Sequence, residues 1–133
     1  MSWFTKKRPP PIRSLVGDGT VLTGSLRFRE GLRIDGQVHG DVIAEGDGCS
    51  ILVIGDNGRV SGRVVASHVI ISGEVEGPVH STELLELQPK ARVFGEVRYE
   101  LLEMHPGAQV DGDLKPLKNA DKPALKLAAS NDA

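Results

Sequence analysis

Hydrophobic and polar residues alternate with a period of two along most of this chain, and residues 71–79 show the pattern most clearly. In that segment, positions taken by an aliphatic residue or glycine alternate with serine, glutamate or proline. A period of two is typical of a β-strand that buries one face and leaves the other in water. The pattern therefore predicts a protein built from strands.

A five-residue phrase recurs within this pattern, and it consists of an aliphatic residue, a spacer, glycine, a second spacer and another aliphatic residue. Its six copies are residues 22–26, 38–42, 60–64, 75–79, 93–97 and 110–114. The central glycines follow one another at steps of 16, 22, 15, 18 and 17 residues. Repetition at such a period indicates a solenoid, in which each repeat contributes one coil.

A second pair of aliphatic residues lies between successive phrases, so each repeat carries several short strands. These pairs are Leu32/Ile34, Ile51/Val53, Val69/Ile71, Leu85/Leu87 and Leu102/Met104. No segment with a helical period separates them, which removes the crossover helices of an α/β sheet. The 133 residues include only five Phe, Trp and Tyr, and a thin aliphatic core needs no more. We predict an all-β, single-domain parallel β-helix of about six coils.

One repeat is oversized, and its surplus residues are expected in a surface loop at residues 45–50, because loops absorb insertions at low cost. The loop is acidic and rich in glycine but lacks the ligand pattern of an EF-hand, so we predict a plain loop. It contains Cys49, the only cysteine of the chain, which excludes an internal disulfide.

Charge divides the chain into three parts. Residues 1–14 carry a net charge of +4 and residues 115–133 a net charge of +2, which leaves −8 on the body, residues 15–114. Phosphate contacts require clustered lysine and arginine, so an acidic body argues against nucleic acid as a partner. Both tails are predicted to be disordered.

The N-terminal tail combines two aromatic residues, Trp3 and Phe4, with the basic residues Lys6, Lys7 and Arg8. Aromatic side chains favour the bilayer interface, and each basic residue adds about 1 kcal/mol of attraction to anionic lipid. No apolar run is long enough for a signal peptide or a membrane-spanning helix. We predict a short, reversible membrane-binding segment; the alternative is a tail that carries two aromatic residues by chance.

Catalytic and metal-binding patterns are not evident in the sequence. The four histidines, at positions 39, 68, 80 and 105, lie at different offsets from the repeat glycines, so they are not expected to stack into a metal site. The glycine pairs 36/40 and 73/77 precede no helix and therefore form no phosphate-binding loop. We predict no enzymatic activity, no cofactor and no nucleotide.

The two ends of a β-helix carry unpaired backbone N–H and C=O groups, which soluble solenoids cover with a polar cap. The first and last phrases of this chain resemble the internal ones, and no amphipathic cap follows. Open ends predict end-to-end association. The expected interface residues are Val21, Leu22 and Leu26 at one end, and Phe94, Leu101, Leu102, Val110 and Leu114 at the other. Phe94 is included because its strand alternation points it outward.

The alternating segments 34–42 and 71–79, the period of about 17 residues and the flanking tails together resemble the bactofilins, a family of bacterial cytoskeletal proteins. The resemblance covers residues 15–114. It implies a right-handed, three-sided β-helix that forms nonpolar filaments without nucleotide, joined head-to-head and tail-to-tail. It further implies a cytoplasmic protein, peripheral at the inner membrane through its N-terminus, that localises cell-wall or morphology factors.

Two other functions remain open at this point. A monomeric β-solenoid adaptor would use its acidic sides to bind a basic partner and would stay a single rod in physiological salt. A hexapeptide-type acyltransferase, or a related zinc hydratase, requires aliphatic and glycine positions at a spacing of six. Here the glycines of each pair are four apart and the histidines do not converge, so the polymer-forming scaffold is preferred.

Overall fold

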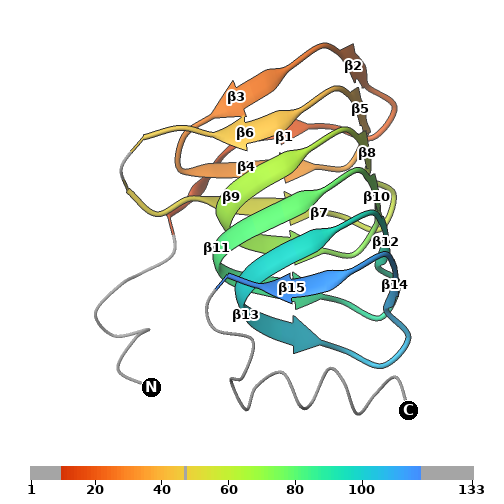
Figure 1. Cartoon of the computed structure of the whole chain (residues 1–133). Helices are drawn as coiled ribbons and strands as arrows, with labels where there is room; N and C mark the ends of the chain where they lie inside the picture. The colour runs from red at the N-terminus through yellow and green to blue at the C-terminus, as the bar shows by residue number, and fades with distance from the viewer. Residues whose placement is uncertain (1–9, 47, 118–133) are drawn as a thin grey trace.

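The computed structural model describes residues 10–46 and 48–117, which form strands and turns only (Figure 1). The strands are β1 (Ile12–Val16), β2 (Val21–Thr23), β3 (Leu26–Phe28), β4 (Gly31–Ile34), β5 (Gln37–His39), β6 (Val42–Ala44), β7 (Ile51–Ile54), β8 (Arg59–Ser61), β9 (Val64–Ile71), β10 (Glu74–Glu76), β11 (Val79–Leu87), β12 (Arg92–Phe94), β13 (Val97–Met104), β14 (Gln109–Asp111) and β15 (Leu114–Pro116). Every strand pairing is parallel.

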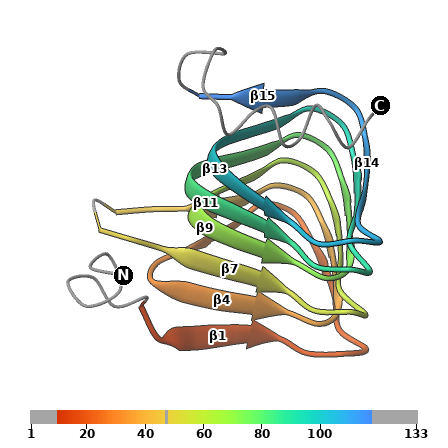
Figure 2. The same cartoon turned by 90° about the horizontal axis from the view of Figure 1, so that it is seen from below.

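The strands stack into three faces around one core. Face 1 is the sheet β2-β5-β8-β10-β12-β14. The other sheet bends along the long strands β9, β11 and β13 and supplies two faces. Face 2 holds β3, β6, the first halves of these long strands, and β15; face 3 holds β1, β4, β7 and their second halves (Figure 2). The chain thus makes six coils within the described residues, and the predicted parallel β-helix is confirmed.

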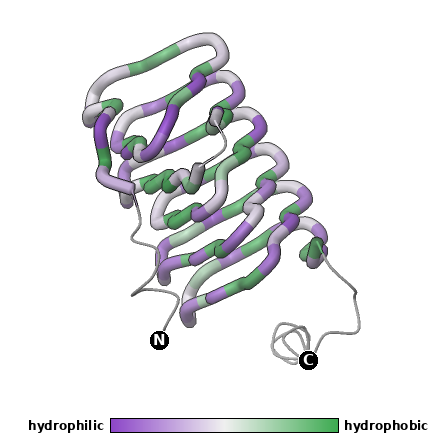
Figure 3. The backbone as a smooth tube through the Cα atoms, turned by 90° about the vertical axis from the view of Figure 1, so that its left-hand side faces the viewer, coloured by the Kyte–Doolittle hydropathy of each residue, from purple (hydrophilic) through white to green (hydrophobic). Residues whose placement is uncertain are grey.

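The core is built from columns of aliphatic side chains that stay in register from coil to coil. On face 1, Val38, Val60, Val75 and Val93 are partners in successive strands, and each is at most 1% exposed. Within each strand, the two residues that flank the valine point outward. Hydrophobic and hydrophilic positions therefore alternate along the coils (Figure 3). The alternation of the sequence is therefore the alternation between core and solvent.

The six repeat glycines stack at the corner that joins face 1 to face 2. Gly24, Gly40, Gly62, Gly77, Gly95 and Gly112 all have positive φ angles. A Cβ atom added at Gly77 would lie 2.3 Å from the carbonyl oxygen of Gly62 in the preceding coil. The phrase therefore requires glycine for both its backbone conformation and the close approach of neighbouring coils.

On face 3, the aliphatic pairs Leu32/Ile34, Val69/Ile71 and Leu85/Leu87 point inward, and each of these residues is at most 1% exposed. In β7 the residues in register with these columns are Leu52 and Ile54, both 0% exposed, whereas Ile51 is 8% exposed and Val53 is only partly buried. The pair Ile51/Val53 therefore lies one position away from the inward columns. Because β7 consists of four consecutive aliphatic residues, its sequence has no alternation from which to read the face. Pairing with Leu32 and Val69 sets the register instead.

The surplus residues of the oversized repeat lie where they were predicted, at the corner between β6 and β7. Seven residues, 44–50, separate Ile43 from Ile51, whereas only two residues separate their partners Val65 and His68 in β9. The extra residues leave the ladder at this corner, and the stacking of the coils continues on either side of it.

Candidate polymer interface at the two ends of the β-helix

The first coil ends the stack on its N-terminal side. Among the described residues, its strands β1, β2 and β3 each have a partner on one side only, namely β4, β5 and β6. Leu22 and Leu26 point inward from β2 and β3, where they are partly buried against the core. Val21 is 58% exposed on the outer side of β2. This end therefore combines a free ladder edge with an open apolar cross-section.

The last coil ends the stack on the opposite side and consists of the second half of β13, β14 and β15. Leu102, Val110 and Leu114 continue the inward columns of the core and are covered from one side only. Leu101 lies on the outer side of β13 and is 55% exposed. The C-terminal end thus also exposes backbone edges and apolar side chains together.

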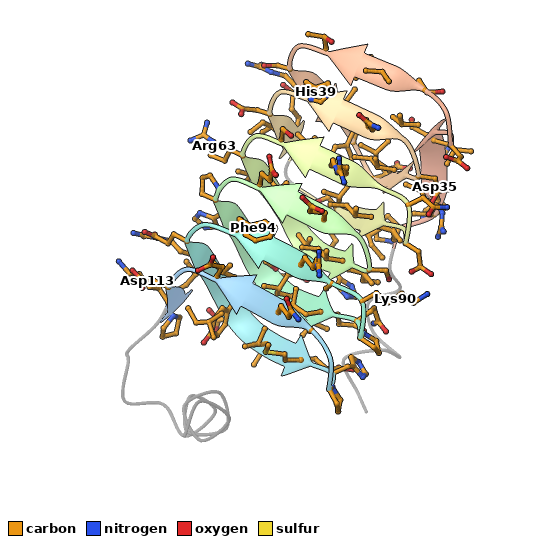
Figure 4. The ribbon with its side chains drawn as sticks, turned by 90° about the vertical axis from the view of Figure 1, so that its right-hand side faces the viewer. Asp35, His39, Arg63, Lys90, Phe94 and Asp113 are labelled. Atoms are coloured by element: carbon orange, nitrogen blue, oxygen red, sulfur yellow. The ribbon has the colours of Figure 1, made fainter. Side chains whose placement is uncertain are left out.

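Phe94 lies apart from the other predicted interface residues. It belongs to β12, the fifth of the six strands of face 1, and it is 39% exposed on the outer surface (Figure 4). Its neighbours in the adjacent coils are Glu76 and Asp111. A contact through Phe94 would therefore involve the side of the rod near its C-terminal end.

Sequence reasoning missed other apolar residues of the terminal coils. Ile12 and Leu15 are exposed on β1, Met104 is partly buried at the end of β13, and Leu117 is exposed after β15. Their position in the first or last repeat could have identified these residues as part of the ends, whereas their residue type could not. β1 begins at Ile12 and β15 ends at Pro116, so strand structure extends on both sides of residues 15–114.

Ion pairs surround the apolar centre of each end. Near the N-terminal end, Arg13 pairs with Glu30, and Arg27 pairs with Glu45 at 3.0 Å. Near the C-terminal end, Glu96 pairs with Arg98 and, at 3.6 Å, with Lys115. The hydrogen bond from Arg98 lowers the pKa of the Glu96 carboxyl, and the nearby positive charges act in the same direction. Water screens such exposed pairs, so they contribute little to the stability of the fold.

Tyr99 is a buried polar residue next to the C-terminal end. It points inward from β13 between Ser81 and Pro116, and burial raises the pKa of its phenol. Among the described residues its hydroxyl has no hydrogen-bond partner. A change of contacts at the terminal coil would therefore change the environment of the Tyr99 side chain.

A polar cavity of about 300 Å³ opens at the corner between faces 3 and 1. It forms because the fourth coil crosses this corner with two residues, 72–73, whereas the coils on either side use four. Four of its five charged residues form two long ion pairs, Arg59 with Glu74 at 3.5 Å and Lys90 with Asp56 at 3.7 Å; the fifth is Arg92. No cysteine, serine or histidine is among the residues that line it.

The predicted membrane-binding residues, Trp3, Phe4, Lys6, Lys7 and Arg8, lie outside the described residues, as does nearly all of the predicted C-terminal tail. Within the part of the chain that the structure describes, no helix is long and apolar enough to cross a membrane.

The fold and its ends define a class, that of β-helical rods whose terminal coils are open to further stacking. Residues 14–115 match the family model of bactofilins, described as polymer-forming cytoskeletal proteins. The chain therefore belongs to the bactofilin family.

Two relatives accompany this match. Over 85 residues, the chain is 30% identical to bactofilin BacP of Myxococcus xanthus; the match takes in 64% of this chain and 34% of that protein, so the chain spans about a third of its relative. A cryo-EM reconstruction of double helical filaments of Thermus thermophilus bactofilin superimposes with a TM-score of 0.65 at 32% identity. This similarity covers 77% of the present chain and 99% of the other.

Proposed function

We propose that this chain is a cytoskeletal scaffold that assembles without nucleotide into nonpolar filaments through end-to-end contacts of its β-helix. One observation carries the proposal: within residues 10–46 and 48–117, both terminal coils expose unpaired strand edges together with the apolar cross-section of the core. Stacking a second rod on either end would pair those edges and bury Leu22 and Leu26, or Val110 and Leu114. No step of this assembly requires an energy source.

The nonpolar arrangement follows from symmetry and strand direction. A head-to-tail contact would continue the parallel ladder, whereas a contact between two like ends would pair strands in antiparallel order. Antiparallel pairing is slightly more stable per residue, and a contact between like ends has the two-fold symmetry common in homo-oligomers. We therefore assign one junction to two N-terminal ends and the other to two C-terminal ends.

Assembly without nucleotide is tested by sedimentation of the untagged chain after treatment with apyrase. We expect the same pelleted fraction with and without added ATP or GTP, because the proposed junctions consist of side chains and backbone edges alone. A pellet that appears only with nucleotide would overturn this part of the proposal. A rod that stays in the supernatant under all conditions would favour the monomeric adaptor.

Membrane association is the second part of the proposed function. The segment that contains Trp3 and Phe4 precedes β1, so it leaves the rod beside the N-terminal end. We assign it the role of a reversible anchor at the cytoplasmic face of the inner membrane. The acidic sides of the anchored rod would then be free to recruit cell-wall or morphology proteins.

The anchor predicts that replacing Trp3 and Phe4 together by alanine reduces binding to anionic liposomes at least tenfold, because the aromatic contribution to interface binding is lost. Co-sedimentation with phosphatidylglycerol vesicles measures the effect. Val65→Ala is the control, since it removes an outward-facing apolar side chain from the middle of the rod, away from the proposed junctions. Equal binding by the double variant and the unmodified chain would refute the anchor and leave filament formation unaffected.

A further inference from the structure

Face 3 carries a cluster of three side chains that could ligate a metal ion, Glu86, Glu103 and His105, on its outer surface near the C-terminal end of the rod, with His68 beside them. Glu86 belongs to β11, Glu103 to β13, and His105 follows β13 directly; His68 belongs to β9. We propose that this cluster binds a divalent transition metal ion, with Zn²⁺ as the best fit. The proposal concerns a single chain and does not depend on filament formation.

The strand register creates the cluster. Glu86 and Glu103 are partners in β11 and β13, and both point outward because their neighbours Leu85 and Leu87 are buried. Parallel strands lie about 4.8 Å apart, so the two carboxylates are stacked as direct neighbours. Like charges in this position repel each other. A cation between them removes the repulsion.

The partners of these two carboxylates differ from those of the other acids that form ion pairs on the rod. Asp35, Asp56, Glu74 and Glu96 each form an ion pair with arginine or lysine. In the described part of the chain, the ion pairs of Glu86 and Glu103 are with histidine only. Imidazole nitrogen together with carboxylate oxygen is a donor set that zinc binds.

The donor atoms are close to the geometry of a zinc site. One ligand atom each from Glu86, Glu103 and His105 lie within 4.8 Å of one another, and His105 Nε2 lies 3.1 Å from Glu103 Oε2. Zinc bonds of about 2.0 to 2.1 Å in a tetrahedral arrangement place donors about 3.4 Å apart. Small side-chain rotations would close this difference. The fourth position would then be open to water.

His68 and Gln88 hold Glu86 in place. His68 Nε2 lies 2.9 Å from Glu86 Oε1, and Gln88 Nε2 donates to Glu86 Oε2 at 3.4 Å. Because an ionised carboxylate only accepts hydrogen bonds, Nε2 is the protonated nitrogen of His68. The His68 side chain is only 12% exposed, and its Nδ1 has no partner among the described residues. Such outer contacts orient ligating groups and tune metal affinity.

Binding must free one nitrogen lone pair. The form of His105 that can coordinate is the neutral imidazole protonated at Nδ1, so any proton on Nε2 is lost before coordination and the ring itself carries no charge. The metal ion then takes the Nε2 lone pair and one oxygen from each carboxylate. The two negative charges of Glu86 and Glu103 balance the two positive charges of the ion, so the site becomes neutral.

Isothermal titration of the untagged, full-length chain with ZnCl₂ tests the proposal. We expect one Zn²⁺ per chain, and at least a tenfold loss of affinity in Glu103→Gln and in His105→Ala. His68→Gln, which alters only an outer contact, is expected to weaken binding about tenfold. His39→Ala is the matched control, because His39 is an exposed histidine on face 1 (Figure 4).

The outcomes separate the site from adventitious binding and from the proposed function. Absence of binding, or equal affinity in the unmodified chain and in both ligand variants, overturns the metal site. Glu103→Gln is nearly isosteric, so it keeps the test valid if His105→Ala fails to fold. Electron microscopy of the same samples shows whether filaments form, and that result has no bearing on the zinc affinity of a single chain.

Discussion

Leu114→Arg is expected to abolish long filaments and to leave dimers joined through their N-terminal ends. Leu114 stacks on Val97 in the last coil and is covered from one side only, so a C-terminal junction would bury it completely. Burying an unpaired charge costs at least about 3 kcal/mol, which lowers the association constant by roughly two orders of magnitude. Analytical ultracentrifugation and negative-stain microscopy measure the change.

Two further variants make this result specific. Leu22→Arg is expected to leave dimers joined through the C-terminal ends, and the double variant is expected to be monomeric. Val65→Arg is the control, because Val65 faces outward from the middle of the rod and should leave filaments intact. Long filaments of the Leu114 variant would place the junction elsewhere, and the side of the rod near Phe94 would be the next surface to test.

Gly77→Ala is expected to lower the stability of the β-helix by at least about 3 kcal/mol, through backbone strain and steric overlap. The φ angle of Gly77 is +142°, and a Cβ atom would lie 2.3 Å from the Gly62 carbonyl oxygen. Neither backbone can move without breaking the ladder of an internal coil. The melting temperature should fall by on the order of 15 °C for a domain of this size.

Circular dichroism at equal protein concentrations measures this effect. Gly48→Ala is the matched control, since Gly48 lies in the loop before β7 and a Cβ atom there meets no atom within 4 Å. It should unfold within about 2 °C of the unmodified chain, a shift of less than about 0.5 kcal/mol. A Gly77 variant as stable as the Gly48 variant would contradict the proposed role of the stacked glycines.

The fold was largely predictable because one local phrase carries most of its information. The six glycines that stack at one corner occur once in each repeat, and the aliphatic residues on either side of each glycine form the inward columns. The buried face could not be identified from the sequence in β7, where four consecutive aliphatic residues show no alternation and pairing with the neighbouring coils sets the register.

The sites were less predictable because they depend on relations between coils. Leu114 and Val110 read as ordinary core residues, and only their place in the last coil exposes them. The four histidines do not stack, as their offsets indicated, yet two of them flank the stacked pair Glu86 and Glu103. The spacing of 17 between those glutamates, equal to one repeat, was the available signal.

Cryo-electron microscopy of the untagged chain, assembled without nucleotide, tests the central claim most directly, because it shows both the polymer and the direction of each rod. We predict filaments in which successive β-helices alternate in direction and meet through their terminal coils. Filaments with all rods pointing the same way would contradict the nonpolar arrangement. Discrete single rods would contradict assembly itself.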